Sequence, residues 1–121
     1  MKFMALIYGD ESGWETSSDA DRAAAYAQYR AFADEARAAG VLAGGEELAS
    51  TRDATTVRVR DDETLVTDGP YAEVKEALGG FFVLECESLD EAVEHAAKIP
   101  GAEHGAVEVR PVYVDPTEVQ L

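Results

Sequence analysis

The chain has 121 residues, 25 acidic against 10 basic side chains, and a formal net charge of −15. This length fits a single domain, and a hydrophobic content of 46% is ample for a packed core. A field this negative excludes direct nucleic-acid binding and attachment to anionic membranes, which both require clustered Lys and Arg. The charge favours solubility and indicates no particular substrate.

The sequence predicts neither a disulfide nor a bound metal or cofactor. Cys86 is the only cysteine, and its apolar neighbours predict a buried thiol rather than a nucleophile. His95 and His104 lack the spacing of metal ligands, and the glycine pairs match no phosphate- or dinucleotide-binding motif. Residues 1–8 are too short for a signal peptide, and no apolar segment approaches membrane-helix length. We therefore expect a cytoplasmic protein.

The first part of the chain predicts a strand, a loop and a helix. Residues 2–8 are apolar on both alternations, which indicates a strand covered on both faces. A loop follows over 9–17, and its Trp14 either clamps the loop to the core or packs over a pocket mouth or subunit contact. A capping box at Ser18 begins a helix that ends at Gly40. Its apolar stripe consists of Ala25, Tyr29, Phe32 and Ala36.

The middle of the chain predicts a strand over 41–48 and then a β-hairpin. Residues 56–60 and 64–67 have strand composition and flank an acidic run at 61–63. Turn-forming residues follow over 68–71, and we expect a short helical patch over 72–77.

The last part of the chain repeats the strand–helix–strand order. A strand is predicted over 81–86, and a second capping box at Ser88 begins a helix that runs through Ala97. Its stripe consists of Leu89, Ala92, Val93 and Ala96. The last strand is expected over 106–114. We place one domain at 1–115 and a C-terminal tail at 116–121.

This order predicts a ferredoxin-like α+β sandwich, β-α-β, hairpin, β-α-β, with both helices on one face of the sheet. The opposite face of such a sheet is open to water in a monomer. Yet the strands at 2–8 and 81–86 are apolar on both sides. A second copy packed sheet to sheet is the simplest cover, so we expect a homodimer.

Asp68, Glu108 and Arg110 are the leading site candidates. Asp68 either takes a proton or holds a ligand at a strand end, or caps the turn and the short helix expected after it. If Val107 and Val109 face the helices, alternation sends Glu108 and Arg110 to the open face. There they either bind a ligand, with the guanidinium holding a carboxylate or phosphate, or form an ion pair across the subunit boundary.

Three further side chains are weaker candidates. Lys75 is either a cation of the cleft or an exposed surface charge. Tyr8 either offers its hydroxyl to the cleft or is a core tyrosine. His104, in the loop before the last strand, is the one histidine placed to reach a cleft and carry a proton near neutral pH.

Residues 68–82 resemble the signature of the YCII-related proteins of the DGPF type, in this chain DGPYAEVKEALGGFF. The likeness continues through 89–92 and 99–101 into 107–112. With the N-terminal strand it covers nearly the whole chain. An Asp-Gly-Pro turn alone is common, whereas this ordered combination is specific.

The resemblance implies a ferredoxin-like dimeric α/β barrel with a cleft between the subunits, and a frequent association with extracytoplasmic-function sigma factors. For YCII proteins proper it also implies a catalytic His on the first helix and an Asp in an Asp-Pro pair after the second. This chain departs at both places, because its first predicted helix has no histidine and Ile99-Pro100 stands where Asp-Pro would be. The dyad therefore does not carry over.

Three functions follow as hypotheses. The first is an enzyme that acts on a small metabolite in the intersubunit cleft, with anions among the candidates and with Asp68 and His104 handling protons. The second is a non-catalytic ligand-binding or regulatory dimer linked to sigma-factor-dependent transcription. The third is a purely structural homodimer.

Overall fold

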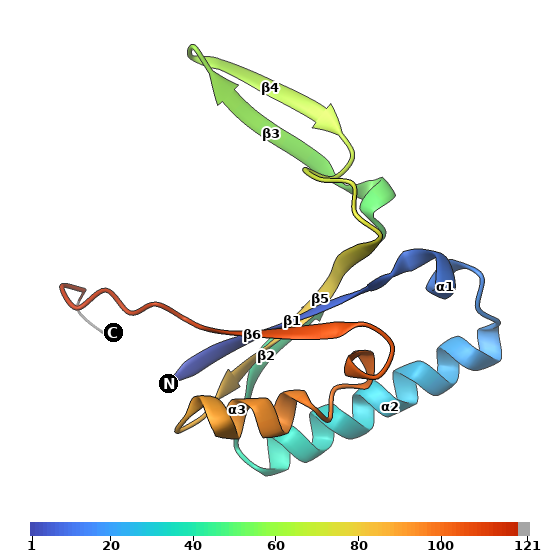
Figure 1. Ribbon diagram of the computed structural model, residues 1–121, viewed down its shortest axis with the longest axis vertical. Coiled ribbons are helices and arrows are strands. Elements are labelled where there is room, and N and C mark those ends of the chain that lie inside the picture. Colours follow the sequence, from blue (N-terminus) through green and yellow to red (C-terminus); the bar gives the residue numbers. More distant parts are fainter. Residues whose placement is uncertain (119–121) are drawn as a thin grey trace.

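The main sheet has four antiparallel strands, and the computed structural model describes residues 1–118 of the chain. The strand order is β2-β5-β1-β6. Two helices, α2 (Asp19–Ala38) and α3 (Leu89–Ala96), lie along one face of this sheet (Figure 1). The strands are β1 (Lys2–Asp10), β2 (Leu42–Glu47), β5 (Glu76–Glu85) and β6 (Ala106–Pro111). The expected α+β class with antiparallel strands is confirmed.

The core lies between the sheet and the helices. Phe3 and Ala5 of β1 point into it and pair in register with Leu84 and Phe82 of β5. The helices contribute the buried side chains Phe32, Ala36, Ala92 and Ala96. Because successive strand residues alternate between faces, the other half of β1 is directed away from this core.

The predicted helix starts are confirmed. Ser18 accepts a hydrogen bond from the Asp21 amide at 3.1 Å, and Ser88 accepts one from the Glu91 amide at 3.2 Å. These serine oxygens satisfy amides that have no partner inside the first helical turn. The predicted stripe of α3 is only half right: Leu89 and Val93 remain 50% and 49% exposed, because they line an open groove between α3 and the core side of the last strand.

A hairpin of β3 (Thr55–Arg60) and β4 (Glu63–Asp68) forms a separate two-stranded sheet, as expected. Its turn consists of Asp61 and Asp62, which both adopt positive φ, at 51° and 63°. A two-residue turn of this kind matches the right-handed twist of the strands. Figure 1 shows the hairpin projecting from the body on the side away from α2 and α3.

Two predicted segments are wrong. The loop expected over 9–17 contains the end of β1 and a short helix, α1 (Glu11–Glu15), whose first turn is capped by Asp10. The helical patch expected over 72–77 is absent, since β5 already begins at Glu76 and pairs there with Asp10 of β1. Cross-strand pairing outweighs the helix propensity of this segment.

Smaller differences concern the ends of elements. The last strand stops at Pro111 rather than at 114, although the Val112 amide still donates to the Lys2 carbonyl at 2.9 Å. Part of the predicted tail, 119–121, lies outside the described residues. Cys86 is buried, as expected, at 3% exposure. No helix among the described residues is long and apolar enough to cross a membrane.

Candidate functional site

The face of the sheet opposite the helices carries a row of apolar side chains that no other part of residues 1–118 covers fully. Met4 and Leu6 of β1 pair with Val83 and Phe81 of β5. All four are only partly buried. Their neighbours on the same strands, such as Phe3 and Leu84, are buried in the core. This half-covered surface is called the open face below.

Glu108 and Arg110 lie on this open face, where alternation along the last strand placed them. Arg110 pairs with Met4 and Glu108 with Leu6, while Val109 lines the core side of β6. Arg110 Nε donates to Glu108 Oε2 at 2.9 Å, and Arg110 Nη2 contacts the same oxygen. The guanidinium is therefore already paired with a carboxylate of its own strand, which weakens its attraction for a free anion.

A shallow hollow of about 610 Å³, largely open to solvent, lies at the end of the sheet where β1 leads into α1. It is lined by Tyr8, Glu76, Ala106, Val107 and Glu108. A phenol hydroxyl and two carboxylates are its polar groups, so the hollow presents acceptors and negative charge to a ligand. Of the predicted site residues, Tyr8 and Glu108 are brought together here.

Glu76 was missed by the sequence reasoning, which placed it in a helix. The register of β1 and β5 shifts between Ile7 and Tyr8, so that Tyr8 pairs with Leu78 and Asp10 with Glu76. That shift brings Glu76 to the hollow. The glycine pair at 79–80, where the register shifts, was the local signal that could have indicated this bulge, because glycine inside a strand often marks one.

Asp10 and Lys75 border this end of the sheet. Hydrogen bonds from the Ser12 hydroxyl and amide hold the pKa of Asp10 below its usual value, and the nearby charge of Lys75 adds to this effect. Lys75 itself is exposed and does not line the hollow.

Asp68 and His104 lie outside the hollow. Asp68 ends β4 at the base of the hairpin, is exposed, and pairs through its backbone with Thr55. The helix that it was expected to cap does not form. His104 is exposed in the turn before β6. The structure therefore does not bring these two side chains together around Tyr8 and Glu108.

Comparison with known proteins now adds to this geometry. The model of the YCII-related domain matches residues 1–114 of the chain. The chain belongs to the YCII-related family. An uncharacterised protein of Rhizobium meliloti (strain 1021) is 37% identical over 114 residues, which cover 93% of this chain and 92% of that protein.

The residue that follows the turn after α3 has a structural role in this YCII-related protein. Ile99 is fully buried and belongs to the core cluster with Phe32 and Ala96. An ionised carboxylate in its place would be removed from water without a partner. Core packing therefore occupies this position.

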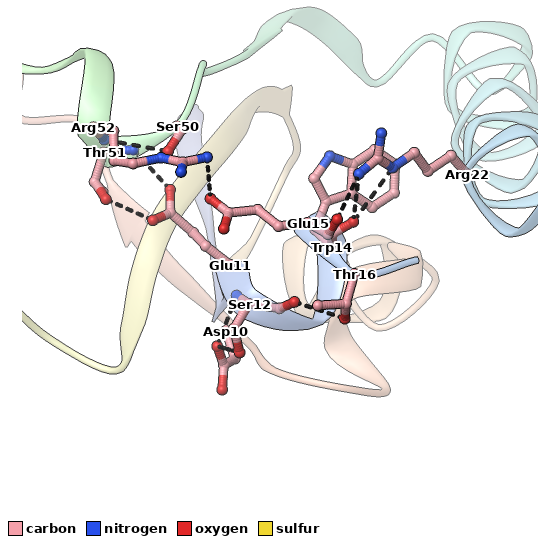
Figure 2. A network of polar contacts seen from close by, with 10 residues as sticks. All are labelled: Asp10, Glu11, Ser12, Trp14, Glu15, Thr16, Arg22, Ser50, Thr51 and Arg52. Carbon is pink, nitrogen blue, oxygen red and sulfur yellow. Dashed lines mark hydrogen bonds and ion pairs between the residues drawn. The ribbon is translucent and has the colours of Figure 1, made fainter. Parts of the chain in front are cut away.

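The base of the hairpin is tied to the body by polar contacts around α1 (Figure 2). Glu11 accepts hydrogen bonds from the amide and the hydroxyl of Thr51, and Arg52 pairs with Glu15 at 2.9 Å. Trp14 lies edge-on to Tyr26 of α2, with ring centroids 5.4 Å apart. In this YCII-related protein Trp14 therefore clamps its segment to α2.

Proposed function

We propose that this YCII-related protein works in the cytoplasm as a homodimer that packs open face to open face. The strand order β2-β5-β1-β6, with α2 and α3 on one face, supports a ferredoxin-like arrangement. Pairing two such sheets would form a dimeric α/β barrel and remove the partly exposed Met4, Leu6 and Phe81 from water. That uncovered apolar row is the observation that carries the dimer.

The hollow lined by Tyr8, Glu76 and Glu108 is the proposed ligand site. It lies at the end of the open face, so it would become a cleft between the two subunits. Two carboxylates and a phenol favour a small polar metabolite that offers a cationic or hydroxyl group. The expectation of an anionic ligand is weakened, because the Arg110 guanidinium is held by Glu108. The same pair compensates the charge of Glu108, so Glu76 is the carboxylate of the hollow that offers its charge to a cationic group.

Two versions of this function remain as proposals. In the enzymatic version, a carboxylate of the hollow, Glu76 or Glu108, exchanges a proton with the bound metabolite. In the non-catalytic version, the dimer only binds the ligand and serves a regulatory role, which the resemblance would connect to a sigma factor. The buried Ile99, in place of a YCII-type aspartate, favours the non-catalytic version.

The test begins with the mass of the full chain by sedimentation, followed by a thermal-shift screen against a metabolite panel. A ligand at 100 times its dissociation constant stabilises the folded state by about 2.7 kcal/mol. Glu76→Gln should abolish the shift given by cationic or hydroxyl-rich compounds, while Glu94→Gln on the exposed side of α3 should retain it. Equal shifts in both variants would show that the hollow is not the site.

A further inference from the structure

The two faces of the β3–β4 hairpin differ in chemistry. On one face lie the side chains of Val57, Val59 and Val66, because Val57 and Val66 are cross-strand partners and Val59 follows two residues later. They are 60%, 58% and 64% exposed. The other face is polar in part, and its Arg58 lies over the ring of Tyr71 at 5.2 Å. The valine face has no such partner among the described residues.

A hairpin of this kind does not account for its own stability. Within the described part of the chain, β3 and β4 pair only with each other, and nearly every residue in them is exposed. An isolated two-stranded hairpin is marginally stable in water, and it usually needs a third strand or a packed surface. The valine face therefore indicates a surface that covers it in the working assembly.

The hairpin nevertheless has a fixed direction. The bonds from Thr51 to Glu11 and from Arg52 to Glu15 hold its first connection against α1 (Figure 2). Its two ends are joined by the Gly69 amide, which donates to the Ala54 carbonyl at 2.8 Å. Held in this way, the hairpin extends from the body on the side of the sheet away from the helices (Figure 1). That is the side of the open face.

The open face is small compared with the area that a stable dimer interface buries. The edge strands β2 and β6 have six residues each. The central strands β1 and β5 have nine and ten. With strands about 4.8 Å apart and about 3.4 Å per residue, the sheet has a surface of roughly 500 Å² in plan. A stable interface buries about 800 Å² on each partner. The open face alone leaves little margin, and an arm that extends past it adds contact area.

We propose that the β3–β4 hairpin is a dimerisation arm whose valine face, Val57, Val59 and Val66, packs on a second copy of this chain. The inference rests on the proposed dimer and adds the element that holds it. The acidic turn of Asp61 and Asp62 stays in water at the rim, because burying it against another chain of net charge −15 would be unfavourable.

The test compares two neighbouring residues of β4 that point to opposite faces. Val66→Lys adds a charge to the valine face, and Thr67→Lys adds the same charge to the other face. Both side chains are exposed, so both variants should fold. We expect Val66→Lys to raise the dimer dissociation constant about tenfold or more by sedimentation, and Thr67→Lys to change it less than about threefold.

A second measurement needs no variant. Hydrogen exchange of the amides over 55–68 in the wild type should be slow in the dimer and fast after dilution to monomer. If the two lysine variants have equal dissociation constants and the hairpin amides exchange fast in the dimer, the proposal of the arm is overturned. The proposal of the open-face dimer is unaffected by that result. Leu6→Lys tests the open face separately. If the Leu6→Lys variant remains a dimer while the Val66→Lys variant dissociates, the sheet-to-sheet contact is overturned and the arm is supported. A wild type that is monomeric at every concentration would overturn both proposals.

Discussion

Glu11 and Thr51, which are forty residues apart in the sequence, form a two-point contact: the Thr51 amide donates to Glu11 Oε1 at 2.8 Å and its hydroxyl donates to Oε2 at 2.5 Å. Both oxygens of one carboxylate are therefore used to hold the segment that enters the hairpin. Such charge-assisted bonds are stronger than neutral ones. The contact joins α1 to the hairpin base in the same chain.

This contact predicts a loss of stability in acid. The bonds from the Thr51 hydroxyl and amide hold the pKa of Glu11 below its usual value of 4.5. The contribution of Glu11 to the free energy of unfolding is therefore fully present above the pKa that Glu11 has in the unfolded chain. It is lost as the pH falls through the lower pKa that Glu11 has in the folded protein. Glu11→Gln should flatten the fall in unfolding free energy on acidification from about pH 5. Glu94→Gln should leave that slope as in the wild type.

The size of the effect is modest because Glu11 remains in contact with water. We expect Glu11→Ala to cost about 1 kcal/mol in urea unfolding at neutral pH. Hydrogen exchange of the hairpin amides should rise in the same variant, since the base of the arm is released. Unchanged exchange would show that Glu11 does not fix the arm.

Gly105 predicts a severe steric effect. A Cβ atom at this position would lie 2.0 Å from the Tyr8 carbonyl oxygen, where β6 begins beside β1. Gly105→Ala should therefore destabilise the protein by more than about 2 kcal/mol, because backbone on both strands must move. Gly13→Ala is the matched control, since its Cβ meets no atom within 4 Å and lies in α1. Thermal unfolding of the two variants measures the difference.

The buried position of Ile99 predicts that this core does not tolerate an aspartate there. Ile99→Val should cost about 1 kcal/mol, as expected for removal of one buried methylene. Ile99→Asp should cost more than about 3 kcal/mol, because it buries a carboxyl group without a partner. Circular dichroism and urea unfolding check both values. A stable Ile99→Asp variant would mean that this site tolerates the acid after all.

Cys86 should react slowly with thiol reagents. Burial raises the pKa of its thiol, and the negative charge of Glu91 adds to the shift. Because the thiolate is the reactive form, reaction of the folded protein with a disulfide reagent near pH 8 should be at least about 100-fold slower than in denaturant. Comparable rates in the two states would contradict the buried position.

Asp68→Ala should change stability by less than about 0.5 kcal/mol, since the helix that Asp68 was expected to cap is absent. Its backbone pairing with Thr55 is retained in this variant. A loss near 1 kcal/mol in urea unfolding would restore the capping interpretation. Ligand binding in the same variant tests whether Asp68 has a role at the site.

The sequence by itself determined the elements whose signals are local. Ser18 and Ser88 start helices because a serine oxygen within three residues satisfies a free amide. The two-sided apolar pattern of β1 predicted the uncovered face, and the strict alternation of β6 placed Glu108 and Arg110 on it. Each of these features depends on residues that are close together along the chain.

The tertiary structure alone decided how distant segments meet. Glu76 reaches the hollow only because β5 pairs with β1 through a shifted register, which overrides the helix propensity of 72–77. The Glu11–Thr51 contact likewise joins residues that are forty positions apart, and it helps to set the direction in which the hairpin projects. The pairing partner of a strand lies far away in the sequence, so local preference alone does not determine which segments meet.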